Sequence, residues 1–267
     1  MNETERRSSS TRAKNRVLIS LLALVAAFGP SALAEIRYSV TYLQGSTAIA
    51  INNSGQVLFE RYVGYSPRSF LYSGGTTNDL GALGGLSTRV QGINDSGQLV
   101  GGYYGSDGYN HAFLFSGGSL TDLGTLGGPG SGAAGINNSS QIVGSADTDS
   151  EYWHAFIYSG GTMTDLGTLP GYRYSGARAI NDRGQIVGLL TDTGGGLRAF
   201  FCSSNGPMVD MGTLGGTRTY VYDINNSGQA VGYSRTTNDS FNHAFLYSNG
   251  SMTDLGTLGG DLSEAHG

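Results

Sequence analysis

A histidine or an arginine recurs along this chain at a nearly constant distance before an aspartate, and such a pair could perform acid–base chemistry. The basic members are Arg68, His111, His154, Arg198 and His243. The acidic members are Asp79, Asp122, Asp165, Asp210 and Asp254. An imidazole beside a carboxylate is a common general acid–base pair in enzymes. A reaction centre needs only one such pair, so five copies favour a structural contact, and we assign no catalytic residue.

The spacing of each pair predicts a hairpin that places the two side chains on one face of a sheet. In the third copy, a turn at the Gly-Gly pair of residues 160–161 sets Phe156 opposite Asp165. His154 and Asp165 then become diagonal neighbours on adjacent strands, within reach of a long side chain. Histidine and arginine can both donate hydrogen bonds to a carboxylate, which explains why either one serves.

These pairs belong to a unit of about 43 residues that is written five times. Its most regular marker is an Ile-Asn pair with steps of 42, 43, 44 and 44 residues, at Ile51, Ile93, Ile136, Ile180 and Ile224. A fixed period of this size indicates stacked units that bury their apolar faces only against their neighbours. Each unit holds four short strand-like segments separated by turns. We therefore predict an all-β, β-propeller-like array of four-stranded antiparallel blades.

The completeness of the ring stays open at this stage. Residues 38–43 resemble the fourth strand of a unit, and residues 263–267 resemble the start of a sixth unit. The five units either close a ring by themselves or form part of a larger propeller.

The first turn of each unit carries a strong conformational expectation. Its Asn-x-x-Gly pattern is typical of a type I turn that ends in a left-handed residue, where glycine has no steric cost. In the third unit Ser140 stands in place of this glycine. The pattern predicts a positive φ for Ser140, so that replacing it with glycine should relieve strain.

The first 34 residues predict a secretory signal peptide. They combine a basic start, the apolar run 17–28 and small residues before Glu35, which is the order expected of such a peptide. We expect cleavage after Ala34, a single repeat domain over residues 35–267, and a location in the periplasm, on the cell surface or outside the cell. No other stretch is apolar enough to predict a membrane helix.

The charge of the expected mature chain excludes several partners. Removing residues 1–34 leaves 10 of the 15 basic and 18 of the 20 acidic residues, a formal net charge of −8. This balance argues against binding to nucleic acid or to an anionic membrane surface. The single cysteine, Cys202, aligns with aromatic residues in the other units, so we expect it to be buried rather than reactive.

Ligand contacts are expected on the long loops of varied sequence and at varied positions near the axis. Variable loops on a regular scaffold usually carry binding residues, and aromatic side chains among short polar ones suit sugars or peptides. The alternative is that these aromatic side chains cover the edges of the blades. The candidate ligand-binding residues are Tyr109, Trp153, Arg178, Tyr222, Asp223, Arg235 and Phe241.

One loop has the composition of a weak calcium site. Asp147, Asp149 and Glu151 alternate along it, and carboxylate oxygens are calcium ligands. The loop lacks the glycine and the distal glutamate of a defined calcium loop, so a solvated surface loop is the alternative. No other metal and no cofactor is indicated by the motifs of this chain.

Four motifs together resemble a known bacterial family. They are His-Ala-Phe, Ile-Asn-x-x-Gly-Gln, Val-Gly and Asp-Leu-Gly-Thr-Leu-Gly-Gly, and they run over about residues 38–267. This combination is similar to the bacterial extracellular repeat family named HAF. The resemblance implies an exported bacterial protein and supplies no catalytic residues. The first and fourth units depart from the tripeptide, with Arg68-Ser69 and Arg198 in place of its start.

The expected function is therefore a non-catalytic binding or structural role outside the cytoplasm, with an extracellular glycan or protein as the ligand. The alternative is a propeller enzyme that acts on glycans, with one irregular blade supplying its acids. Glycosidases set two carboxylates in one pocket, whereas here only Asp223 stands clearly out of the repeat register. The sequence does not indicate an oligomeric state.

Overall fold

A computed structural model describes residues 43, 46–64, 66–80, 83, 88–237 and 241–267. The predicted signal peptide and its cleavage site after Ala34 lie outside the described residues. Within the described ranges, no helix is long and apolar enough to cross a membrane.

The described chain forms twenty strands in five antiparallel sheets, each made of four consecutive strands. The first blade contains β1 (Ser46–Ile51), β2 (Val57–Val63), β3 (Ser66–Ser73) and β4 (Thr76–Asp79). The second contains β5 (Thr88–Ile93), β6 (Leu99–Tyr104), β7 (Asn110–Ser116) and β8 (Ser119–Asp122). The third contains β9 (Gly127–Ile136), β10 (Ile142–Thr148), β11 (Trp153–Ser159) and β12 (Thr162–Gly167). The fourth contains β13 (Tyr174–Ile180), β14 (Gln185–Thr191), β15 (Leu197–Ser203) and β16 (Val209–Asp210). The fifth contains β17 (Gly215–Ile224), β18 (Ala230–Thr236), β19 (Asn242–Ser248) and β20 (Ser251–Asp254).

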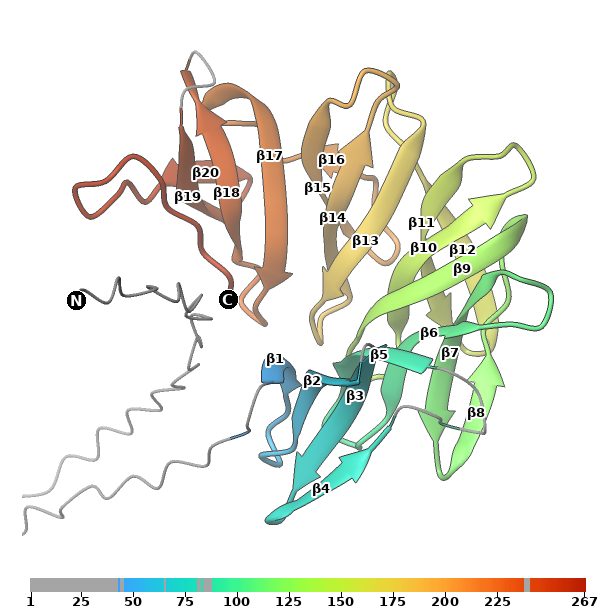
Figure 1. The fold of residues 1–267 in the computed structure, drawn as a ribbon. Helices are drawn as coiled ribbons and strands as arrows, with labels where there is room; N and C mark the ends of the chain where they lie inside the picture. Colours follow the sequence, from blue (N-terminus) through green and yellow to red (C-terminus); the bar gives the residue numbers. More distant parts are fainter. Residues whose placement is uncertain (1–42, 44–45, 65, 81–82, 84–87, 238–240) are drawn as a thin grey trace, which may run out of the picture.

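The blades follow one another in chain order around a common centre, as Figure 1 shows, which confirms the prediction of a propeller of four-stranded blades. The first strands contact each other in the sequence β1, β5, β9, β13 and β17, so they form the inner wall. The outer strand of each blade is short, with four residues in β4, β8 and β20, six in β12 and two in β16.

The core lies between the blades rather than within them. Val143 and Ala155 of the third blade, for example, pack against Ile186 and Phe200 of the fourth. The phenylalanine of the repeated tripeptide is almost fully buried in every blade, at Phe70, Phe113, Phe156, Phe200 and Phe245. Burying one such side chain contributes about 1.5–3 kcal/mol. A single blade leaves this surface open, so the units depend on their neighbours for stability.

The asparagine of the Ile-Asn-x-x-Gly-Gln motif holds its own turn together and joins it to the next blade. In the third blade, Asn137 Oδ1 accepts the N–H groups of Ser139 at 3.1 Å and Gln141 at 2.9 Å. Asn137 Nδ2 donates to Gln141 Oε1 at 2.8 Å and to the main-chain carbonyl of Asn181, in the next blade, at 3.0 Å. The same inter-blade hydrogen bond joins the other consecutive turns, from Asn52 to Asn94, from Asn94 to Asn137 and from Asn181 to Asn225.

Each first strand contains a β-bulge that the sequence did not predict. The pairing register between the first and second strands of every blade shifts by one residue. One residue per blade is therefore left without a partner in the ladder. A bulge redirects a side chain and bends its strand, which suits the crowded wall of a channel. The five bulge residues are Ile49, Gln91, Ala134, Arg178 and Tyr222.

The bulge also explains the glycine of the Val-Gly motif. A Cβ added to Gly144 would overlap the carbonyl oxygen of Gly132 on the first strand and lie 2.9 Å from Ala133 Cα. Gly101, Gly188 and Gly232 are in the same close approach to their first strands. The first blade departs from this rule, because Phe59 stands at the position and stacks on Phe70.

We expect Gly144→Ala to destabilise the protein by about 1–3 kcal/mol, because the new methyl group must push two backbones apart. Chemical denaturation of the purified variant measures this loss. Gly260→Ala is the matched control, since nothing lies within 4 Å of a Cβ at that position. Equal stability of the two variants would contradict the close approach.

Ser140 has a φ of 59°, which confirms the left-handed conformation expected at the end of its turn. Its hydroxyl also donates to Gln98 Oε1 in the second blade at 2.7 Å, a contact that the sequence did not reveal. The relief expected from Ser140→Gly is therefore offset by the loss of an inter-blade hydrogen bond worth about 0.5–1.5 kcal/mol.

The free-energy cost of the left-handed conformation at position 140 is measured by comparing two variants that both lack the hydroxyl. We expect Ser140→Gly to be more stable than Ser140→Ala by about 1 kcal/mol, because only alanine keeps a Cβ in the left-handed region. Thermal or chemical unfolding measures the difference. At Ser139, which is not at positive φ, the same comparison should not favour glycine. A Ser140 pair of equal stability would show that the turn is not strained.

Candidate functional site

The repeated basic–acidic pairs are contacts within the blades. His154 Nδ1 lies 2.8 Å from Asp165 Oδ2, and the corresponding distance for His243 and Asp254 is 2.9 Å. Arg68 Nη1 lies 3.0 Å from Asp79 Oδ2, whereas Arg198 and Asp210 are 3.9 Å apart. The predicted register is also confirmed, because Phe156 pairs with Asp165.

The second pair differs from the others. His111 Nε2 lies 2.9 Å from Asp107, while its Nδ1 lies 3.6 Å from Asp122. The hydroxyl of Tyr103 donates to Asp122 at 2.8 Å instead. Burial and this hydrogen bond raise the pKa of Tyr103 to about 12.

The aspartate of each pair has a second role that accounts for the Asp-Leu-Gly motif. Asp165 Oδ1 accepts the N–H of Gly167, and Gly167 has a positive φ of 68°. The aspartates Asp122, Asp210 and Asp254 accept the equivalent glycine N–H at 2.7–2.8 Å. In these four blades the aspartate therefore holds the exit turn of the outer strand, which supports the structural interpretation.

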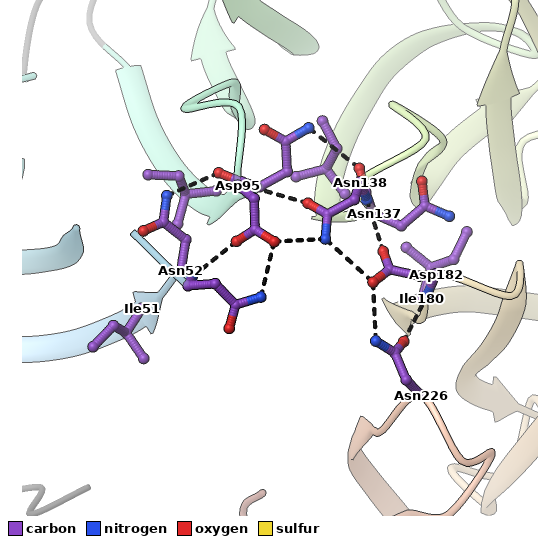
Figure 2. Close-up of a pocket in the computed structure, with 12 residues that line it drawn as sticks. Ile51, Asn52, Asp95, Asn137, Asn138, Ile180, Asp182 and Asn226 are labelled. Carbon is purple, nitrogen blue, oxygen red and sulfur yellow. Dashed lines mark hydrogen bonds between the residues drawn. The ribbon is translucent and has the colours of Figure 1, made fainter. Parts of the chain in front are cut away.

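A ring of alternating amide and carboxylate side chains surrounds the axis on the side of the Asn-x-x-Gly turns. Its members are Asn53, Asp95, Asn138, Asp182 and Asn226, the residues that follow the inter-blade asparagines. Figure 2 shows Asp95, Asn138, Asp182 and Asn226 linked by hydrogen bonds around a hollow of about 170 Å³. Ile51, Ile93, Ile136 and Ile180 also line this hollow.

Asn138 lies at the middle of this ring. Its Nδ2 donates to Asp95 Oδ2 at 2.8 Å and to Asp182 Oδ2 at 3.2 Å, so one amide separates two carboxylates. The N–H of Asn53 and its side-chain amide hold the pKa of Asp95 below its ordinary value. The N–H of Asn138 and the amides of Asn226 and Asn138 lower the pKa of Asp182. Both groups are therefore anionic at neutral pH.

A second group of polar and aromatic side chains lies where the first strands of the fourth and fifth blades meet. The guanidinium of Arg178 lies 5.0 Å from the ring centre of Tyr220, and Tyr220 stacks on Tyr233 at 5.5 Å. Tyr222 contacts both tyrosines at 4.8 Å and 6.0 Å and stacks on His266 at 4.0 Å. We call Arg178, Tyr220, Tyr222, Tyr233 and His266 the tyrosine cluster.

Two carboxylates are neighbours of Tyr222: Glu264 in space and Asp223 in sequence. The hydroxyl of Tyr222 donates to Glu264 at 3.1 Å, and burial together with this carboxylate raises the pKa of Tyr222. Asp223 accepts the N–H of Ile224 at 2.8 Å, while desolvation by the surrounding strands raises its pKa. The structure thus brings Arg178 and Tyr222 into one cluster through Tyr220, and Asp223 follows Tyr222 in β17.

Trp153 belongs to a separate aromatic group at the start of β11. Its ring stacks on Tyr174 of the next blade with centres 4.0 Å apart, and it remains partly exposed. Tyr152 packs edge-on against Tyr174, and its hydroxyl accepts a hydrogen bond from Arg173 at 2.7 Å. Trp153 therefore covers a neighbouring blade with one part of its surface and stays open to solvent with another.

Of the remaining predicted residues, Tyr109 and Phe241 lie on loops, and Arg235 lies in β18. Tyr109 is exposed between β6 and β7, and Phe241 is exposed between β18 and β19. Arg235 pairs with Asn242 across the hairpin that also carries Phe241. Arg235 lies two residues after Tyr233 in β18, and its charge acts on that tyrosine. Tyr109 and Trp153 belong to the second and third blades, so the seven candidates are spread over several blades.

The structure also places the weak calcium candidates and Cys202. Asp147 accepts the N–H of Gly130 at 3.1 Å, and Glu151 has a positive φ of 64°. Among the residues that the structure describes, no group of three histidine, cysteine or acidic side chains could hold a metal ion. Cys202 is buried as predicted, and burial raises the pKa of its thiol to about 12.

Sequence reasoning missed Tyr220, Tyr233 and the whole amide–carboxylate ring. The tyrosines look like ordinary strand residues, and the ring residues look like turn residues. A usable signal was present in the alternation of Asn and Asp directly after the repeated Ile-Asn pair.

No protein-family model matches this chain, and the search of curated proteins found no match. Solved structures do match. TolB from Acinetobacter baumannii has a TM-score of 0.55 at 13% identity, over 78% of this chain and 51% of that one. A protein assigned as TolB from Agrobacterium tumefaciens has a TM-score of 0.58 at 14% identity, over 79% and 81% of the two chains. A puromycin hydrolase S511A mutant complexed with PGG has a TM-score of 0.50 at 16% identity, over 76% and 36%.

These likenesses establish the class of fold. The chain is a β-propeller, and it spans about half the length of the Acinetobacter TolB chain. Identities this low show the fold alone, so the function has to be argued from this chain's own residues.

The ring makes stability depend on pH in a defined direction. A carboxyl group whose pKa is lowered in the folded state contributes stability above its unfolded pKa of about 3.9, and this contribution is lost as the pH falls through the folded pKa. We therefore expect Asp182→Asn to lower stability at pH 7 by less than about 1 kcal/mol, since the group is exposed.

The same variant should lose less stability than the parent protein when the pH is lowered from 5 to about 2. Melting temperatures across this range measure both effects. Asp149→Asn, on an exposed loop, is the control and should follow the parent curve. A parallel shift of the Asp182→Asn curve at every pH would contradict the role of the ring.

Proposed function

We propose that this protein is an exported, non-catalytic binding protein of the HAF repeat type, which holds an extracellular glycan or protein segment at the tyrosine cluster. The observation that carries the proposal is that this cluster is not repeated. Most contacts described above recur from blade to blade, whereas the residues equivalent to Arg178 and Tyr222 are Ile49, Gln91 and Ala134.

The chemistry of the cluster suits a ligand with both polar and apolar surfaces. Aromatic rings offer flat surfaces for stacking, and tyrosine hydroxyl groups supply hydrogen bonds at the same place. Arg178 is exposed and Tyr222 is half-buried, so both retain surface that a ligand can contact. Glu264, which accepts the Tyr222 hydroxyl, adds an acceptor at the border of the cluster.

The absence of a catalytic assignment rests on the roles that the repeated groups already have. The histidines and aspartates that could act as acid–base pairs hold hairpins and exit turns together. Each copy repeats a contact that a hairpin requires, which leaves no reason to expect one of them to carry a reaction.

Export is supported by the order of residues 1–34 and fits the predominance of acidic over basic residues in the remainder. The ligand is accordingly expected outside the cytoplasm. The resemblance to the HAF family points in the same direction.

The test is a glycan array and a peptide array probed with residues 35–267, followed by calorimetry with the best ligand. We expect binding without turnover. Tyr222→Ala should weaken binding by about 1–3 kcal/mol, because aromatic anchors carry much of the energy of such sites. Trp153→Ala should do the same if the ligand extends over the partly exposed indole.

Ser227→Ala is the matched control, since Ser227 is an exposed turn residue of the same blade as Tyr222. Its affinity should equal that of the parent protein, and only variants with unchanged melting temperature are compared. Loss of affinity in Ser227→Ala but not in Tyr222→Ala would place the ligand on the opposite side. Consumption of the ligand over time would replace the proposal with an enzyme.

A further inference from the structure

The fifth blade has an apolar face that no other blade covers. The leucine or methionine after each repeated aspartate packs against the following blade, and Leu80, Leu123 and Met211 are only 4–7% exposed. Leu166 of the third blade is half-buried. Leu255 holds the same position in the fifth blade and is 53% exposed. Leu258 is fully exposed, whereas its counterpart Leu83 is 9% exposed.

The first blade also has an uncovered apolar residue, on the face that would contact a preceding blade. Ile93, Ile180 and Ile224 end their first strands against the preceding blade and are 7–9% exposed. Ile51 ends the first strand of the first blade and is 55% exposed. The uncovered faces of the first and fifth blades therefore flank a single gap, which Figure 1 shows between β1 and β17.

The inter-blade hydrogen bonds stop at the same gap. Asn225 Nδ2 donates to Gln229 Oε1 at 2.9 Å, but within the described residues it has no carbonyl of a following blade. The carbonyl of Asn52 accepts the N–H of Gly55, and no side-chain amide among the residues that the structure describes donates to it from a preceding blade. One donor and one acceptor of this series are thus left open, one on each side of the gap.

The amide–carboxylate ring defines the residue that would fit between them. It runs Asn53, Asp95, Asn138, Asp182, Asn226, so the two members beside the gap are both asparagines. The Asn138 amide donates to the carboxylates on both sides. The amides of Asn53 and Asn226 each donate to one carboxylate and keep one N–H for another. An aspartate between them would accept both.

The last residues of the chain already follow the path of a further inner strand. The hydroxyl of Ser263 accepts the N–H of Ala244 at 2.9 Å and donates to the carbonyl of Gly256 at 2.6 Å. Ser131 makes the same two bonds between the second and third blades, and Ser175 makes them between the third and fourth. Ser263 therefore contacts the fifth blade in the way that the first-strand serine of a following blade contacts the blade before it.

We propose that the gap between the first and fifth blades is a docking site for one further unit of this repeat, with an aspartate after the asparagine of its first turn. Such a unit presents all four required features together: two apolar faces, an asparagine carbonyl for Asn225, an asparagine amide for Asn52 and a carboxylate for the ring. A second copy of the chain presents an asparagine, Asn53 or Asn226, at the ring position of either end blade, so it lacks the carboxylate that the gap requires.

The test extends the full chain after Gly267 with a copy of residues 180–214, because Gly267 aligns with the residue before Ile180. We expect the melting temperature to rise by at least about 5 °C, since two apolar faces become buried. The face itself is followed by introducing Leu255→Cys, whose reaction with a thiol reagent should slow at least tenfold on extension. Cys202 is buried and serves as an internal reference.

The matched control is the same extension in which the added copy carries Asp182→Asn. It should slow labelling of Leu255→Cys as well but give a smaller rise in melting temperature, because the carboxylate is missing. A second extension, with a copy of residues 93–126, supplies another unit with an aspartate in its turn and guards against misfolding of the first.

Each extension is scored by two results, a higher melting temperature and slower labelling of Leu255→Cys. The proposal is overturned if no extension gives both results. It is also overturned if the 267-residue chain sediments as a dimer in which Leu255→Cys is already protected, since a second copy would then cover the face. Equal melting temperatures for the aspartate and asparagine extensions would remove the ring from the argument and contradict the stated identity of the turn residue.

Discussion

One repeated hydrogen bond, from the side-chain amide of one turn asparagine to the main-chain carbonyl of the next, joins the inner turn of each blade to that of the following blade. It links residues 42 to 44 positions apart and recurs between consecutive blades. The bond requires the asparagine side chain to be held by its own turn, which its Oδ1 achieves by accepting two N–H groups. The left-handed residue of the turn and the following glutamine are needed for the same reason. Four positions of the repeat thus serve one contact.

The sequence predicted those features that depend on neighbouring residues in the chain. The four strands per unit, the hairpin turns and the opposition of Phe156 and Asp165 follow from counting along a single hairpin. The ring around Asn138 and the contact of Ser140 with Gln98 could not be counted in this way, because they join residues of different units. Their formation depends on the angle between blades, which packing of the buried side chains determines.

The candidate site shows the same division. Arg178, Tyr222 and Asp223 are candidates from the sequence because they stand at varied positions near the axis. Tyr220 and Tyr233 were missed because a tyrosine in a strand is ordinary. They pair directly across β17 and β18, and Tyr222, at the bulge, adds a third ring beside them. A regular scaffold therefore leaves one position per first strand free to vary without loss of pairing. That freedom is what allows a specific site to arise in a repeated structure.

The short outer strands have a consequence for a chain that contains five nearly identical sheets. Every blade ends in an outer edge whose backbone groups face away from the axis, and a neighbouring molecule with the same strands would be a natural partner for such an edge. Edges of two to six residues, each with an aspartate held by its own turn, offer few groups in register for a foreign strand. A protein built by copying one sequence thereby limits, at its rim, the sheet-to-sheet aggregation that copying would otherwise promote.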